Sequence, residues 1–377
     1  MPEPRKFPHH LIREIFEQPD ALRRTIEPRV SLAAGMVRLD EIHISREELR
    51  ALRRINIVAS GTSRHAGMTG QDMMQELAAV PVDVDYASEF EYRNPMIGPG
   101  ELSIFITQSG ETADTAAAQR KARQQGSRTL AISNVEGSTI AREADGFIYT
   151  QAGPELSIAS TKAFTAQMAC LFLFALYLGN IKEKVSPALA QHYIAELLAL
   201  PPKTEMILAA SDQVEKLAQL YYRVDDFMFL GRGIHYPVAM DGALKLKEVS
   251  YIHAEGYPTG EAKHGPNALI DFRLPLVMIV TCDRNNNDTG SVVRYEKNLS
   301  NLQGFEKQGA TVIALATEGD TTVPQLANHT IFIPQVPELL SPILEIVPLQ
   351  LFAYYVAAKR GLDVDRPRNL VKAVTLE

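Results

Sequence analysis

The segment RINIVASGTS, residues 54–63, is an apolar run that ends in small and hydroxyl-bearing residues, and DFMFLGRG, residues 226–233, has the same design. Each segment predicts a buried strand that passes through a tight turn into a helix. Longer amphipathic stretches separate such runs, which is typical of βα units on a parallel sheet. Two further pairs of apolar runs match in the same order: Leu102–Thr107 with Leu276–Thr281, and Thr129–Asn134 with Thr311–Ala316.

The chain therefore contains an internal repeat. A Pro-Glu-Leu sequence precedes an apolar helix at residues 154–156 and again at 337–339, and the spacing between matched segments grows only from about 170 to 183 residues. We predict an α/β fold of two tandem copies, each a parallel sheet flanked by helices of the nucleotide-binding, flavodoxin type. The predicted parts are an N-terminal helical arm (1–40), a first domain (41–200), a second domain (201–362) and a tail that closes the site (363–377).

Composition narrows the class of protein. The 377 residues are 46% hydrophobic and 22% charged, as in ordinary globular chains, and the net charge of −7 argues against nucleic acid as a partner. The longest apolar run, Met168 to Leu178, is shorter than the roughly 20 residues that cross a bilayer, so we expect a buried helix and no membrane partner. Cys170 and Cys282 lie in apolar surroundings, which predicts buried free thiols. With an N-terminus unlike a signal peptide, this predicts a cytoplasmic protein.

Hydroxyl-rich turns follow the first-copy strands. Ser109, Gly110 and Thr112 lie at a strand-to-helix junction, where hydroxyls and N–H groups at the positive end of a helix bind phosphate. Simple helix capping would use the same residue types. Gly61-Thr62-Ser63 and Ala159-Ser160-Thr161 repeat the chemistry, and we expect all three turns to meet at the carboxyl edge of one sheet.

The stretch from Met240 to Asp271, MDGALKLKEVSYIHAEGYPTGEAKHGPNALID, concentrates groups that move protons. Its first half predicts a helix on which Lys245 and Glu248 share a face, and its second half predicts an ordered loop that carries His264. A solvated charged face is the ordinary alternative. A metal site built from histidines and glutamates of this stretch is another, although no HExxH or CxxC spacing supports it.

Taken together, these motifs make the whole chain resemble the sugar isomerase (SIS) half of the glucosamine-6-phosphate synthase family, which has paired SIS domains. The matching segments are IREIFEQP at 12–19, GTS at 61–63, QSGETADT at 108–115, ASTKAFT at 159–165, GALKLKEVSYIHAE at 242–255, KHGP at 263–266 and PRNLVKAVTLE at 367–377.

The resemblance implies a role for each matching residue. The phosphate and hydroxyls of a hexose 6-phosphate would be held by Thr62, Ser63, Thr107, Gln108, Ser109 and Thr112, with Ile158 and Ser160 lining the same pocket. His264, supplied by the neighbouring subunit of a homodimer, would open the sugar ring. Glu248 would move the proton between C1 and C2 beside Lys245, and Lys372 would form a Schiff base. Thr107 stands where the family often has Ser, which keeps the hydroxyl.

The implied activity is the interconversion of fructose 6-phosphate plus ammonia with glucosamine 6-phosphate, without a metal or organic cofactor. The family enzyme begins with a glutaminase domain, and here Met1 is followed almost at once by the isomerase half, so we expect no glutamine hydrolysis and an amino group from free ammonia or a separate glutaminase. A catabolic glucosamine-6-phosphate deaminase and a fructosamine-phosphate deglycase are alternatives. A non-catalytic sugar-phosphate sensor is another, although no basic helix-turn-helix segment is present.

Overall fold

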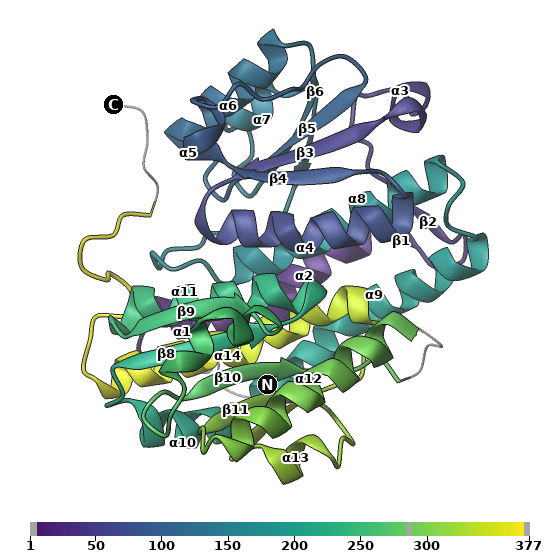
Figure 1. The fold of residues 1–377 in the computed structure, drawn as a ribbon. Coiled ribbons are helices and arrows are strands. Elements are labelled where there is room, and N and C mark those ends of the chain that lie inside the picture. The colour runs from purple at the N-terminus through teal and green to yellow at the C-terminus, as the bar shows by residue number, and fades with distance from the viewer. Residues whose placement is uncertain (1–5, 285–288, 373–377) are drawn as a thin grey trace. The chain divides into compact units, whose positions relative to one another are not determined.

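A computed structural model describes residues 6–284 and 289–372, and these divide between two compact units. Of the described residues, the first-sheet unit comprises 20–154, 162–201 and 371–372, and the second-sheet unit comprises 6–19, 155–161, 202–284 and 289–370. Each unit is built around its own five-stranded sheet (Figure 1). The predicted α/β class and the two copies of a parallel sheet are confirmed.

The first-sheet unit has the parallel strand order β4-β3-β5-β6-β7. Helix α4 packs on β3 and β4 and also against the apolar helix α8, whereas α5, α6 and α7 pack on the strands from the other face (Figure 1). Its strands are β3 (Arg54–Ala59), β4 (Val82–Tyr86), β5 (Glu101–Ile106), β6 (Arg128–Ser133) and β7 (Gly146–Tyr149), with the short pair β1 (Val30–Ser31) and β2 (Met36–Val37). Its helices are α2 (Gln18–Ile26), the 3-10 helix η1 (Glu27–Arg29), α3 (Arg46–Ala51), α4 (Gly61–Ala78), α5 (Ala87–Phe90), α6 (Ala113–Gln124), α7 (Thr139–Glu143) and α8 (Lys162–Ile181).

The second-sheet unit has the parallel strand order β12-β11-β10-β8-β9. Helices α11 and α14 pack together over this sheet, and α12 and α13 pack against its strands β10 and β11. Its strands are β8 (Asp226–Gly231), β9 (His253–Pro258), β10 (Leu276–Val280), β11 (Val312–Thr317) and β12 (His329–Ile333). Its helices are α1 (His10–Phe16), α10 (Ser211–Tyr221), α11 (Tyr236–Ser250), α12 (Thr289–Lys307), α13 (Val323–Leu326) and α14 (Ser341–Lys359). Its 3-10 helices are η2 (Gly233–His235), η3 (Glu261–His264), η4 (Pro266–Leu269) and η5 (Glu338–Leu340). Helix α9 (Pro187–Ala209) contains the boundary between the two units.

Each sheet reverses its strand order at one point. In the first sheet the chain moves outward from β3 to β4 and then continues on the other side of β3 with β5, and in the second sheet β8, β9 and β10 repeat this arrangement. Ligands of open α/β sheets bind beside the carboxyl ends of the strands at such a switch point. The switch points therefore lie after β3 and β5 in one unit and after β8 and β10 in the other.

The prediction of one loop over the second half of the Met240–Asp271 stretch is wrong in part. His253–Pro258 forms the edge strand β9, which pairs in parallel with β8, and two short 3-10 helices follow it. The segment HAEGYP lacks an apolar alternation, because an edge strand is covered on fewer sides than a central one. The strand is formed by its backbone pairing with β8, which the pattern of side chains in the sequence does not indicate.

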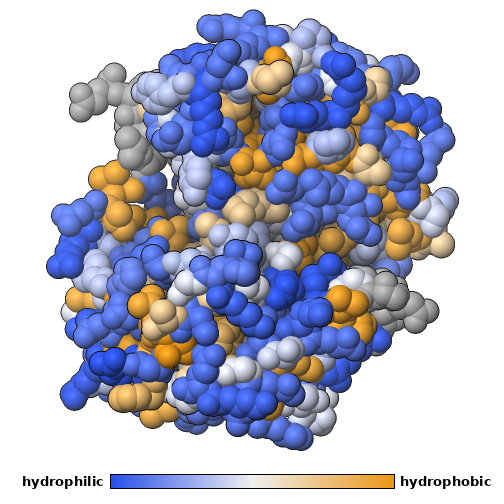
Figure 2. Space-filling view, viewed as in Figure 1, coloured by the Kyte–Doolittle hydropathy of each residue, from blue (hydrophilic) through white to orange (hydrophobic). Residues whose placement is uncertain are grey.

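The long apolar helices are core elements. Residues Lys162–Ile181 and Glu338–Lys359 are long and apolar enough to cross a membrane, but 89% of the most apolar stretch of each is buried inside the fold. The visible face of the molecule is mainly hydrophilic with separate apolar spots (Figure 2). The predicted buried helix around Met168 to Leu178 is thus confirmed, and so are the buried, free thiols of Cys170 and Cys282.

Candidate functional site

The loop after β5 gathers hydroxyl groups at the switch point of the first sheet. The hydroxyl of Thr107 accepts a hydrogen bond from the Gly110 N–H at 3.1 Å and lies 3.4 Å from the Thr112 hydroxyl. Ser109 accepts from the Glu111 N–H at 3.2 Å. Gly110 has a φ of +71°, and a Cβ there would lie 2.0 Å from the Ser138 hydroxyl oxygen, so only glycine fits this turn.

Two findings modify the expectation for this loop. The N–H groups of Gly110 and Glu111 bond within the loop, so they are not open donors as predicted, because the Thr and Ser hydroxyls satisfy them locally. Thr112 is the N-cap residue of α6, but its side chain makes no capping hydrogen bond. The Thr112 hydroxyl therefore does not act as a helix cap, and it lies within hydrogen-bond distance of the Thr107 hydroxyl instead.

The neighbouring strand β3 ends at the start of α4. Thr62 and Ser63 lie in the first turn of this helix, directly after Gly61, whose φ is +52°. Thr62 is buried, and the half-buried Ser63 accepts a hydrogen bond from the Gln167 side chain at 3.0 Å. Because β3 and β5 are adjacent with Ala59 opposite Ile106, both turns leave the same edge of one sheet. The half-buried Gln108 belongs to this edge as well.

Helix α11 in the second-sheet unit carries the predicted acid–base pair. The ammonium of Lys245 is 2.5 Å from the Glu248 carboxylate, and the Lys245 side chain is only 3% exposed against 21% for Glu248. Burial by itself would lower the pKa of Lys245, but the carboxylates of Glu248 and Asp241, with a smaller contribution from Glu155, outweigh it and raise that pKa. Lys245 is therefore a fixed cation that keeps Glu248 in place, not an amine nucleophile.

Sequence reasoning missed Asp241 and Glu155 as parts of this cluster. Asp241 lies four residues before Lys245 on α11, and this spacing was a usable signal because such residues share a helix face. Glu155 belongs to the segment 155–161, and its carboxylate accepts a hydrogen bond from the Thr161 N–H at 2.9 Å. Only the fold could place Glu155 near Lys245, since 90 residues separate the two in sequence (155 to 245).

Ile158 and Ser160 lie in the same segment, 155–161, which follows no strand directly and belongs to the second-sheet unit. The buried carboxylate of Glu14 on α1 holds this segment by accepting hydrogen bonds from the Leu156 and Ser157 N–H groups and from the Ser157 hydroxyl. The Ile158 N–H donates to the Asp365 carbonyl at 3.1 Å. The meeting of this segment with the two hydroxyl turns of the first sheet stays a prediction.

His264 ends the 3-10 helix η3 and is exposed, beside Gly265 with a φ of +138°. In the described part of the tail, Arg368 contacts Tyr251. The Arg368 N–H donates to the Tyr251 hydroxyl at 2.8 Å, and the Arg368 guanidinium stacks over the same ring at 4.2 Å. Lys372 is half-buried and groups with the first-sheet unit, and the predicted motif residues 373–377 lie outside the described residues.

Two other features of the described residues bear on where a site lies. Within residues 6–284 and 289–372, no group of three or more His, Cys, Asp or Glu side chains is arranged to hold a metal ion. A cavity of about 840 Å³ opens near the amino ends of β8, β9 and β10, with His253 and Glu255 in its lining. It contains none of the predicted site residues, and it lies at the end of the strands opposite to the switch point.

The family is shown by a match to the SIS domain model over residues 48–177 and 220–360. The chain belongs to the SIS domain family. The two matched segments correspond to the two sheets, so the duplication inferred from the strand pattern is a duplication of this domain.

Individual relatives show which members of the family the chain is similar to. The chain is 46% identical over 371 residues to glutamine--fructose-6-phosphate aminotransferase [isomerizing] of Chlorobaculum tepidum, which covers 98% of this chain and 59% of the relative. The corresponding protein of Thermus thermophilus is 44% identical with the same coverage. The chain thus spans about three fifths of the length of these curated relatives.

Solved structures agree with this assignment. The C-terminal domain of glucosamine-fructose-6-phosphate aminotransferase from Francisella tularensis superimposes with a TM-score of 0.87 at 37% identity, covering 96% of this chain and 99% of that domain. A glucosamine-6-phosphate deaminase from Thermotoga maritima has a TM-score of 0.70 at 22% identity over 98% of this chain and 100% of its own, which shows the shared fold. The predicted resemblance to the isomerase half is confirmed.

Proposed function

We propose that this chain interconverts fructose 6-phosphate plus ammonia and glucosamine 6-phosphate. The observation that carries the proposal is the Lys245–Glu248 pair, in which a buried cation holds a partly exposed carboxylate at 2.5 Å. A carboxylate fixed in this way can take a proton from one sugar carbon and return it to the next. The names of the curated relatives and the identity of 46% to one of them support the same reaction.

The hydroxyl loop between β5 and α6 is the proposed phosphate site. Thr107, Ser109 and Thr112 bring hydroxyls to the start of a 12-residue helix, and Thr62 and Ser63 bring hydroxyls to the start of an 18-residue helix on the adjacent strand. Two helix N-termini at one sheet edge attract the phosphate dianion, and the hydroxyls supply uncharged donors. Gln108, Ile158 and Ser160 are proposed to contact the remainder of the sugar.

The proposed chemistry begins with ring opening by His264 and condensation of the Lys372 amine with the C2 carbonyl of the open-chain ketose, which forms a Schiff base and releases water. Ammonia then adds to the imine carbon and displaces the Lys372 amine, so that the nitrogen of ammonia stays on C2. Glu248 then moves the proton between C1 and C2, and the Lys245 ammonium stabilises the negative charge of the enediol-type intermediate. In this scheme, Lys245 acts by its charge, which agrees with its raised pKa. The side chains complete the reaction without a metal or organic cofactor.

We propose that ammonia, and not glutamine, is the nitrogen source for these 377 residues. Glutamine hydrolysis by a thiol needs an accessible thiolate. Burial raises the pKa of Cys170 to about 12 and also raises the pKa of Cys282, and these are the two cysteines of the sequence. A separate glutaminase is a proposed partner that would supply ammonia. The cytoplasm, where free thiols persist, is the proposed location.

A paired assay tests the function. Purified protein is given glucosamine 6-phosphate with ammonia release followed, and fructose 6-phosphate with either ammonium or glutamine, each beside the Glu248→Gln variant. We expect turnover with glucosamine 6-phosphate and with ammonium, none with glutamine, and loss in the variant. The ratio of the two rates separates synthesis from deamination. Binding of the sugar phosphate without turnover would instead identify a sensor, and turnover of a phosphorylated fructose-amine alone would identify a deglycase.

The homodimer that shares His264 is tested by mixing inactive variants. If each site takes His264 from the other subunit, a dimer of one His264→Ala chain and one Glu248→Gln chain contains one intact site. Random pairing should then restore about a quarter of the wild-type activity. Mixed dimers that stay inactive, or a fully active monomer in sedimentation-matched assays, would contradict the shared arrangement.

A further inference from the structure

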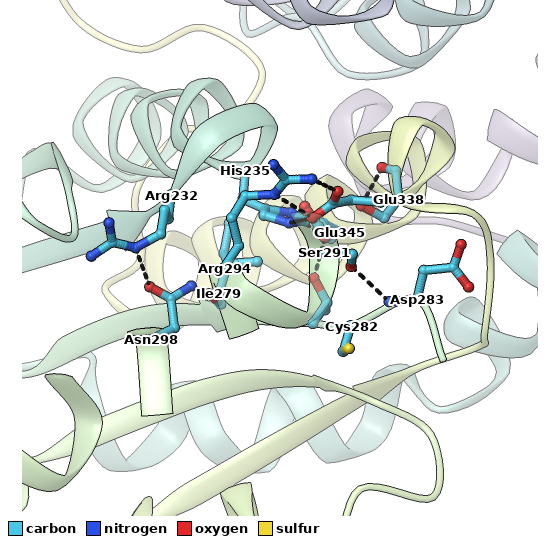
Figure 3. A network of polar contacts seen from close by, with 12 residues as sticks. Arg232, His235, Ile279, Cys282, Asp283, Ser291, Arg294, Asn298, Glu338 and Glu345 are labelled. Carbon is cyan, nitrogen blue, oxygen red and sulfur yellow. Dashed lines mark hydrogen bonds and ion pairs between the residues drawn. The ribbon is translucent and has the colours of Figure 1, made fainter. Parts of the chain in front are cut away.

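A buried network of ionic side chains fills the switch point of the second sheet (Figure 3). His235 lies in the turn after β8 and is 2% exposed. One ring nitrogen, Nδ1, is 2.8 Å from Glu345 Oε1, and the other, Nε2, is 3.2 Å from Glu338 Oε1. The imidazole is thus held between two carboxylates from η5 and α14.

Two further donors complete the network. Arg294 on α12 donates from Nε to Glu338 Oε1 at 2.8 Å and forms a second bond from Nη2 to Glu338 Oε2. Thr281, the residue after β10, donates from its hydroxyl to Glu345 at 2.6 Å. The network therefore joins the ends of β8 and β10 to helices α12 and α14, as the sticks in Figure 3 show for Arg294, His235 and Glu338.

The charges in this network balance. Burial by itself would lower the pKa of His235, but Glu345 and Glu338 outweigh it and raise that pKa to about 10. Burial would raise the pKa of Glu338, but hydrogen bonds from His235 and Arg294 lower it to about 2. An imidazolium and a guanidinium thus face two carboxylates, and the cavity left beside them is only about 10 Å³. That space is too small for a sugar phosphate.

The same positions in the first sheet have uncharged hydroxyls. Gly61 and Gly233 begin the two turns with φ values of +52° and +58°, which aligns Ser63 with His235. Thr107 and Thr281 each follow the second strand of the switch point directly. Among the described residues, the first copy therefore presents hydroxyls that bond to each other, to backbone N–H groups and to Gln167, whereas the second copy surrounds a carboxylate of its own.

We propose that the second switch point is an anion site closed from within, in which the Glu338 carboxylate is the resident anion and positions the start of α11. His235 immediately precedes α11, and Lys245 and Glu248 lie about three turns further along that helix. Glu338 is thus a positioning residue that acts through His235. The kinetic part of this inference rests on the proposed function, and the anion-binding part does not.

Removing the Glu338 side chain should reopen the site to small anions. The Arg294 side chain is 35% exposed, so solvent reaches one side of the pair that Glu338 completes. In Glu338→Ala, formate is the probe, because it supplies a carboxylate small enough for the space left by the side chain. We expect a lower Tm than in the wild type, a saturable rise in Tm with formate, and recovery of kcat with little change in the KM for the phosphosugar.

The matched control is Glu306→Ala, which removes an exposed carboxylate from the same helix as Arg294. The wild type and this control should not respond to formate beyond the general effect of salt, measured with chloride. A Glu338→Ala protein as stable as the wild type, or one whose loss of Tm formate does not reverse in a saturable way, would overturn the proposal. A further outcome separates the two proposals: the Tm of Glu338→Ala recovers with formate, but neither the wild type nor any variant turns over a phosphosugar. In that case the proposed function fails and the anion site stands.

Should Glu338→Ala fail to fold, Glu338→Gln keeps the shape and removes only the charge. The readout is then the titration of the His235 imidazole by NMR, assigned by comparison with His235→Asn. We expect the pKa of His235 to fall clearly below its wild-type value, because one of its two carboxylate partners is neutral. An unchanged His235 titration would show that Glu338 is not the anion that holds it.

Discussion

The two switch points of this duplicated fold differ in the side chains that occupy them. At the first, Thr107, Ser109 and Thr112 offer hydroxyls beside a helix N-terminus, and the charged residue of this loop, Glu111, accepts a hydrogen bond from the Thr139 N–H. At the second, His235 and Thr281 occupy the matching turns and bond to Glu345. Under the two proposals, one copy of the architecture keeps its anion site for a ligand and the other copy closes it with its own side chain.

The repeated Pro-Glu-Leu sequence shows the same divergence. Glu155 contributes to the cluster around Lys245, whereas Glu338 pairs with His235 and Arg294. An equal number of residues further along, the first copy has Lys162 and the second has the oppositely charged Glu345. Both glutamates of the repeat thus interact with residues of α11 or its start: the charge of Glu155 acts on Lys245, and Glu338 bonds to His235, which immediately precedes the helix.

The largest effect should follow from removing the acid–base group. Glu248→Gln should lower kcat by about 10²–10⁴-fold, as for the loss of a general acid–base residue, while fructose 6-phosphate still binds. Turnover assays and calorimetric titration measure the two quantities, with the exposed Glu261→Gln as control. Loss of binding along with turnover would contradict the proposed role of Glu248 as an acid–base group that acts after the sugar phosphate has bound.

Lys245→Met should be the most destabilising single change in the α11 cluster. It leaves Glu248 and Asp241 without their shared cation, and breaking a buried ion pair on one side costs about 3–5 kcal/mol. Chemical denaturation compares it with Lys247→Met, which changes an exposed lysine on the same helix. Equal stability of the two variants would show that the buried cation is not needed to hold these carboxylates.

Substitution of the matched threonines, Thr107 and Thr281, tests the difference between the two switch points most directly. Thr107→Val should raise the KM for the phosphosugar about 10–100-fold, because a hydrogen bond to a charged group contributes about 1.5–3 kcal/mol. Thr281→Val should leave the KM unchanged and lower the free energy of unfolding by about 1–3 kcal/mol, since Glu345 loses a buried donor. Thr107→Val also removes the acceptor of the Gly110 N–H and should lower the free energy of unfolding, so the contrast between the variants lies in the KM. Kinetics and denaturation on both variants check it, and it breaks if Thr281→Val raises the KM as well.

A further prediction is a pH dependence of stability that arises at the second switch point. His235 is protonated in both states below its ordinary pKa of 6.5, and the folded chain keeps the proton up to about 10. Its stabilisation is therefore complete below 6.5 and is lost as the pH rises towards 10. The groups facing the ring are Glu338 and Glu345, with Arg294 beyond Glu338.

Denaturation curves at several pH values test this sign. The free energy of unfolding of the wild type should fall between pH 7 and 10, as the values for His235 require, and the difference from Glu338→Gln should shrink over that range. Subtracting the variant removes the contribution of other titrating groups. A difference between the two proteins that grows with pH would contradict the assignment of His235 as a buried imidazolium.

The sequence by itself determined the central strands and the repeat. The runs at β3, β5 and β6 and at β8, β10 and β11 are buried along nearly their whole length, so each appears as continuous apolar sequence that needs no structure to find. The hydroxyl turns and the helix that pairs Lys245 with Glu248 were readable for a similar reason. Their chemistry depends on neighbours within a few residues.

The edge strands β4, β7, β9 and β12 were decided by the tertiary structure, because partly exposed strands such as HAEGYP have no sustained apolar signal. The same holds for Glu155 near Lys245 and for Glu338 and Glu345 around His235. These contacts join residues roughly a hundred positions apart. Charge neutralisation in a buried space depends on which groups the fold brings within a few ångströms, and local sequence does not encode that distance.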